Sequence, residues 1–170
     1  MRLRILTVIL LLTTLSCGGG DDNAGNPSGS GSGSGNGGPA GNKGTMTATI
    51  DGVAFNGFAT IVRTEIQVGK NMLIMAGGTA DLKTQLSFGA AAAVGTTSIG
   101  GLSPTNALLA VTPGTATWQA NITGGSGSVT IDTITATTAT GRFSFVMIPV
   151  PGSGATGNKT VANGAFNVTF

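Results

Sequence analysis

The feature that most constrains the fold is the pattern from Thr45 onward, where short runs rich in Val, Ile, Thr and Phe alternate with Gly, Pro and Asn. Residues 84–88 alternate polar and apolar side chains, which is the period of a half-buried strand. Helical periodicity is poor, and the alanine run at 90–93 is too short for a helix. Strand-length runs at roughly 8–12-residue spacing predict an all-β fold, either an antiparallel β-sandwich or a small barrel, with about eight to ten short strands.

Two hairpins are indicated by their turn residues. Residues 47–50 lead into Asp51-Gly52, a dipeptide that favours two-residue hairpin turns. Residues 66–68 and 72–75 flank Gly69-Lys70-Asn71, which predicts a second hairpin. Further strands are expected at 53–55, 58–62, 107–111, 115–122, 128–135, 141–148 and 165–170.

The core has to be built by apolar burial alone, because the chain contains one cysteine and no disulfide is possible within it. About 125 residues are enough for one ordinary core. Strand alternation places Phe143 and Phe145 on the same face. We expect that face to point inward and to be filled by the aromatic side chains, namely Phe55, Phe88, Trp118, Phe143, Phe145 and Phe166.

The N-terminus has the layout of a lipoprotein export signal. Arg2 and Arg4 precede an apolar run at 5–12, and Ser16 stands before Cys17, the only cysteine. The run is too short for a membrane-spanning helix, which needs about 20 apolar residues. We expect residues 1–16 to be a signal peptide and Cys17 to be the site of lipid attachment. Thr14, where such signals usually have Leu, leaves open an ordinary cleaved signal with an unmodified cysteine.

A linker follows the cysteine. Residues 17–43 are dominated by Gly and Ser and have almost no apolar side chains to bury, so we expect a disordered tether that connects the lipid anchor to a β domain at 44–170. Its r.m.s. reach would be on the order of 28 Å. A phosphate-binding glycine loop is not indicated, because no strand precedes these glycines and no helix follows them.

Several Gly-punctuated segments of the β domain carry a family resemblance. They lie at 46–55 (Met-Thr-Ala-Thr-Ile-Asp-Gly-Val-Ala-Phe), 94–100, 127–132, 140–145 and 163–168. In these segments the chain resembles a domain-of-unknown-function family of small bacterial lipoproteins. The resemblance implies an antiparallel β domain without an assigned activity, so it gives no functional residues to this sequence. Such domains commonly have a tyrosine in the middle strands, where this chain has Trp118.

Together, the signal and the resemblance predict a lipoprotein of the bacterial cell envelope. Gly18 follows Cys17 in place of the aspartate that retains lipoproteins in the inner membrane, and Asp21-Asp22 resembles an acidic export signal. We therefore expect the protein to be anchored in the outer membrane, where it faces either the periplasm or the cell surface. Two solvating charges in a linker are the alternative interpretation of Asp21-Asp22.

Charge and composition argue against several activities. Without Arg2 and Arg4, the eight basic residues fall to six, which balance six acidic ones and form no basic stripe for nucleic acid. Histidine is absent, so no Ser-His-Asp site can form. The remaining carboxylates of the β domain, Asp51, Glu65, Asp81 and Asp132, show no spacing typical of an acid pair or a metal site. We therefore predict no enzyme, no cofactor and no metal.

Two kinds of binding remain open. The first is a non-catalytic binding or display module, anchored through N-terminal acyl chains, whose partner is a protein or a glycan. The threonines of residues 130–138 form a candidate flat face for an ordered surface such as ice or a glycan, although threonine is also simply a good strand residue. The second is a small barrel that carries an apolar ligand, because many alternate positions are Ala, Gly or Thr and leave room inside.

Overall fold

A computed structural model describes residues 44–67, 70–112 and 114–169, with side chains given for all of these except 60–67 and 70. The predicted signal peptide, Cys17 and the predicted linker lie outside them. The described residues form an all-β domain without a helix. Its ten strands are β1 (Gly44–Ile50), β2 (Val53–Gln67), β3 (Lys70–Gly78), β4 (Thr84–Ala91), β5 (Gly95–Ile99), β6 (Ala107–Val111), β7 (Ala116–Ala120), β8 (Ser126–Ile134), β9 (Thr138–Pro149) and β10 (Lys159–Thr169).

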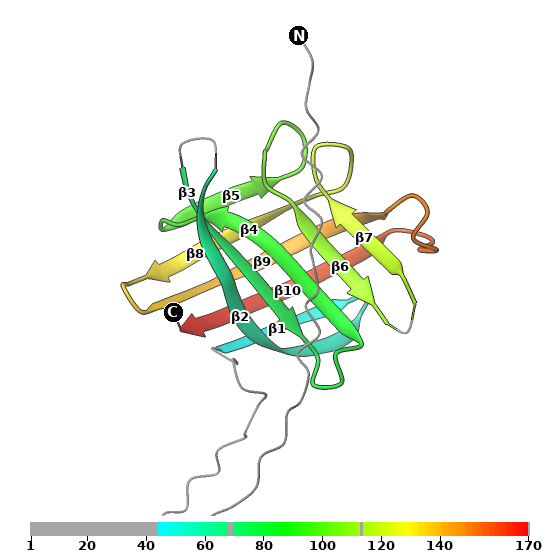
Figure 1. The fold of residues 1–170 in the computed structure, drawn as a ribbon, viewed down its shortest axis with the longest axis horizontal. Helices are drawn as coiled ribbons and strands as arrows, with labels where there is room; N and C mark the ends of the chain where they lie inside the picture. Colours follow the sequence, from blue (N-terminus) through cyan, green and yellow to red (C-terminus); the bar gives the residue numbers. More distant parts are fainter. Residues whose placement is uncertain (1–43, 68–69, 113, 170) are drawn as a thin grey trace, which may run out of the picture. The chain divides into compact units, whose positions relative to one another are not determined.

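Eight of these strands close into an antiparallel barrel. The ring runs β1-β2-β3-β4-β6-β7-β9-β10 and closes because β10 pairs with both β9 and β1. In Figure 1, β3, β4 and β6 cross over β9 and β10, so the barrel consists of two crossed layers. β8 pairs with β9, and β5 pairs with β8. The all-β prediction is confirmed, and of the two predicted architectures the domain is the barrel.

The Asp51-Gly52 hairpin is confirmed. Both turn residues have positive φ, 49° for Asp51 and 81° for Gly52, as expected for a type I′ turn. β2 and β3 form the second predicted hairpin, although Lys70 and Asn71 belong to β3 rather than to the connection.

Three strands differ from the sequence prediction. Residues 53–67 form one strand, β2, which pairs first with β1 and then with β3 and so passes from one layer to the other. β5 was not expected, because Gly95-Thr-Thr-Ser-Ile99 has little apolar alternation and lies between glycines. β10 begins at Lys159 rather than at 165, since Asn163 with φ 53° forms part of an irregularity that interrupts its apolar pattern.

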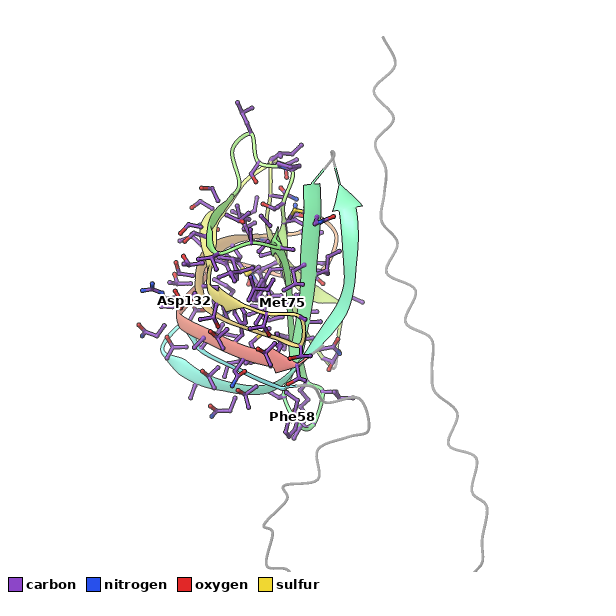
Figure 2. All side chains as sticks on the ribbon, turned by 90° about the vertical axis from the view of Figure 1, so that its left-hand side faces the viewer. Phe58, Met75 and Asp132 are labelled. Atoms are coloured by element: carbon purple, nitrogen blue, oxygen red, sulfur yellow. The ribbon has the colours of Figure 1, made fainter. Side chains whose placement is uncertain are left out.

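The interior of the barrel is filled with apolar side chains from every strand of the ring. The six aromatic residues predicted to be inside are all buried, with 7% of Trp118 and 2% of Phe145 exposed. The ring centre of Phe88 lies 4.7 Å from that of Phe143, 5.4 Å from that of Phe145 and 6.2 Å from that of Phe166. Figure 2 shows Met75 between the two layers and Asp132 on the outer surface. The predicted aromatic core is therefore confirmed.

Candidate functional site

The most regular surface of the domain is a set of hydroxyl and amide side chains on the outside of β5, β8, β9, β10, β1 and the start of β2. We call it the hydroxyl face. One row follows the strand register from Thr96 through Thr130, Arg142, Ala165 and Thr47 to Asn56. Its polar, uncharged members are Thr96, Ser98, Ser128, Thr130, Thr133, Thr140, Ser144, Asn167, Thr45, Thr47, Thr49 and Asn56, all exposed or half-buried.

Two neighbouring rows run parallel to the first. Ser98, Ser128 and Ser144 are aligned across β5, β8 and β9. On the other side, Thr133 is aligned with Thr140, and the row continues through Asn167 to Thr45. Because adjacent strands are about 4.8 Å apart and outward residues alternate along each strand, the face presents polar groups on a regular lattice.

Hydrogen bonds link some of these hydroxyl groups across strands. Thr96 and Thr130 share a hydrogen bond of 2.9 Å, and Thr133 and Thr140 share one of 2.7 Å. A hydroxyl has one donor and two acceptor sites, so each of these groups keeps capacity for an external partner. The bonds fix the side-chain rotamers and reduce the entropy lost when a ligand binds.

One ion pair stands within the hydroxyl face. The Nη2 and Nε atoms of Arg142 donate to Oδ1 of Asp132 at 3.0 and 3.3 Å. Both side chains are largely exposed, so the pair contributes little to stability. It also neutralises both charges, and the face has no net charge among its described side chains.

The predicted flat face at residues 130–138 is only partly the observed one. Thr130 and Thr133 belong to the hydroxyl face, whereas Thr135 and Thr138 close the β8–β9 turn and share a hydrogen bond of 2.9 Å. The contributions of β1, β5 and β10 were missed, because only the register brings these distant segments together. The sequence did contain a local indication for β1, namely threonine at the alternating positions 45, 47 and 49.

The candidate carboxylates do not come together. Asp51 occupies the β1–β2 turn, Asp81 the β3–β4 turn and Asp132 the outer side of β8, while the side chain of Glu65 is not described. Asp81 accepts hydrogen bonds from Thr79 Oγ1 at 2.7 Å and from the Lys83 N–H at 3.1 Å, and these bonds lower its pKa. Among the described residues, no group of three or more His, Cys, Asp or Glu could hold a metal ion.

A polar cluster surrounds Trp118 at one end of the barrel. The indole Nε1–H donates to the Gly157 carbonyl at 2.8 Å, which ties the β9–β10 loop to β7. The Lys159 ammonium lies 5.3 Å from the centre of the indole ring and 2.7 Å from Asp51 Oδ2. The hydrogen bonds from Lys159 and from the Thr160 N–H lower the pKa of Asp51. This cluster connects the β1–β2 turn, β7 and the β9–β10 loop at one end of the barrel.

Within the described part of the chain, no helix is both long and apolar enough to cross a membrane. Comparison of the sequence and the fold with protein-family models, curated proteins and solved structures gives no match.

Proposed function

We propose that this chain is a lipid-anchored, exported module that binds a neutral glycan through its hydroxyl face and catalyses no reaction. The observation that supports this proposal is the alignment of hydroxyl and amide side chains in three rows. The longest row crosses six strands and also contains Arg142 and Ala165. The N-terminal signal and Cys17 supply the anchor in this proposal, at the bacterial cell envelope and in its outer membrane.

The chemistry of the face favours a neutral, hydroxyl-rich partner. Each Thr, Ser or Asn offers both a donor and an acceptor, as a sugar hydroxyl does, so the two surfaces can exchange hydrogen bonds without burying a charge. A single such bond contributes only about 0.5–1.5 kcal/mol net, because it replaces bonds to water. A long polymer can form many such hydrogen bonds with a regular lattice at the same time, and their summed free energy then gives measurable affinity.

The packed interior of the barrel favours binding on its outer surface over binding inside it. Four phenylalanine rings meet at the centre of the barrel, where a carried ligand would have to lie. The closed eight-stranded ring is nevertheless an architecture that apolar-ligand carriers use, and it keeps such a carrier as the second candidate function. Uptake of an apolar dye by the folded wild-type protein would favour the carrier over the external binding module.

Binding to insoluble glycans tests the main proposal. The protein is mixed with cellulose, chitin and purified peptidoglycan sacculi, and the bound fraction is measured after sedimentation. Ala165 is exposed in the longest row of the hydroxyl face, between Arg142 and Thr47, so Ala165→Gln places a bulky side chain among the hydroxyl groups. The matched control is Ala110→Gln, which faces outward on β6.

We expect the Ala165→Gln variant to lose at least about fivefold in affinity for the bound glycan, while the Ala110→Gln variant binds as the wild type does. Equal binding by all three proteins would contradict the role of the hydroxyl face. Failure of the wild type to sediment with any of the three materials would contradict the glycan proposal.

The anchor is tested by mass spectrometry of the protein purified from membranes. We expect the mature chain to begin at Cys17 and to carry acyl groups, and Cys17→Ser to abolish the modification. A mature chain with an unmodified Cys17 would show an ordinary secreted protein instead.

A further inference from the structure

Two large apolar side chains stand fully or mostly in solvent at the tips of neighbouring loops. Leu102 in the β5–β6 loop is fully exposed, and Ile122 in the β7–β8 loop is 66% exposed. Figure 1 shows the two loops side by side at the top of the barrel. They touch at Gly100, where an added Cβ would lie 2.6 Å from the Gly125 carbonyl oxygen. The bases of the two loops are therefore in contact, and each loop carries one exposed apolar side chain.

The loops are held in place beneath their tips. In the β5–β6 loop, Ser103 Oγ and Thr105 Oγ1 donate to the Ser98 carbonyl at 2.7 and 2.8 Å. These bonds hold the β5–β6 loop against the end of β5, with Leu102 fully exposed in the loop.

The β7–β8 loop is fixed in a similar way. Asn121 Oδ1 accepts hydrogen bonds from the N–H and Oγ1 of Thr123, at 2.8 and 2.6 Å, and Asn121 and Gly124 exchange backbone hydrogen bonds. Ordering these tips on a partner surface therefore costs little additional entropy.

The two loops and the segments that flank them in the sequence contain no charged residue. Between Lys83 and Asp132 the sequence has no Asp, Glu, Lys or Arg, and this stretch includes β4 to β7 and both loops. A highly charged partner would find no complementary group there. A lipid surface needs none, because apolar side chains enter it without an ion pair.

We propose that Leu102 and Ile122 insert into the surface of the bilayer to which the chain is anchored, and so fix the orientation of the barrel. This inference rests on the proposed lipid anchor. Burial of one such side chain favours lipid by about one to two orders of magnitude at most, so a protein without the anchor would bind only weakly and at high lipid concentration. A tethered domain is already at an effective concentration on the order of millimolar, where such weak insertion becomes significant.

Site-specific labelling tests the contact. Cys17 is the only cysteine and is consumed by the lipid in the proposed anchor, so Leu102→Cys supplies a unique thiol for an environment-sensitive fluorophore. The matched control is Leu82→Cys, an exposed apolar residue in the β3–β4 turn. Both lipidated proteins are reconstituted in phosphatidylcholine vesicles that contain nitroxide-labelled lipids.

We expect at least about twofold stronger nitroxide quenching and a blue-shifted emission at position 102 compared with position 82. Equal quenching at both positions would overturn the inference. Failure of the anchor would be seen separately, because an unlipidated protein would not be recovered with the vesicles.

A second measurement uses unlabelled protein. The chain from Gly18 onward retains the whole barrel and lacks the apolar signal and the thiol. Its partition to phosphatidylcholine vesicles should fall at least about fivefold with Leu102→Asn combined with Ile122→Asn. It should be unchanged with Val53→Asn combined with Leu82→Asn, which alter exposed side chains at other turns. Equal loss in both pairs, or partition that disappears at high salt, would overturn the inference.

Discussion

Asp51 and Lys159, which are 108 residues apart in the sequence, form an ion pair of 2.7 Å at one end of the barrel. The Thr160 N–H donates to the other oxygen of Asp51 at 2.8 Å, and the Asp51 N–H donates to the Thr160 carbonyl at 2.9 Å. The turn that starts β2 is thereby fastened to the beginning of β10. This contact supports the closure of the barrel at the β1–β10 seam.

The Asp51 contacts predict a pH-dependent stability. Because these contacts lower the pKa of Asp51 in the folded protein, their contribution is present above the ordinary carboxyl pKa of about 4 and is lost as the pH falls through the folded value. Asp51→Asn keeps the turn, since Asn-Gly also favours type I′ geometry. The free energy of unfolding in urea should differ between the two proteins at pH 7 and converge near pH 2. A difference that persists at low pH would mean that charge is not its cause.

Trp118 should report on the polar cluster at its end of the barrel. Trp118→Phe retains an aromatic ring in the core and removes the hydrogen bond to Gly157, so we expect the free energy of unfolding to fall by about 0.5–1.5 kcal/mol.

Because Trp118 is the only tryptophan, its fluorescence reports this site alone. Lys159→Met should shift the emission without unfolding the protein. An unchanged spectrum would show that the ammonium does not occupy the ring face in solution.

Phe145 should be required for stability. Its side chain is buried and lies 5.5 Å from the Phe143 ring centre, so Phe145→Ala should cost about 3–5 kcal/mol in chemical unfolding. Phe58→Ala is the matched control and should cost much less, because Phe58 is on the outer side of β2 and half-buried. A stable Phe145→Ala protein that takes up an apolar dye in its native state would favour the ligand carrier over the filled core.

A side chain at Gly141 should destabilise the domain. A Cβ at this position would collide with the Thr130 carbonyl and with the Phe166 ring, so Gly141→Ala should destabilise the domain by about 1–3 kcal/mol. In Gly89→Ala the nearest atoms would be 3.9 Å away, and we expect little change. Thermal unfolding of both variants measures the difference. Similar midpoints would show that β9 can move away from β8 without cost.

The sequence alone determined the class of the fold and most of its core. Period-two alternation in Phe143-Ser-Phe145 placed both rings inward, and Asp51-Gly52 defined a turn, because these signals act between near neighbours. Gly95–Ile99 gave no such signal, because its pairing partner is β8, whose paired residues lie 28 to 36 positions further along the chain.

Only the tertiary structure decided between a sandwich and a barrel, because ring closure depends on β10 pairing with β9 and β1 at once. The hydroxyl face likewise depends on the tertiary structure. Thr96, Thr130 and Thr47 come from three distant segments, and their alignment follows from strand register. A register shift of one residue would turn a strand's hydroxyl groups inward, so burial of the apolar side fixes which side chains remain outside.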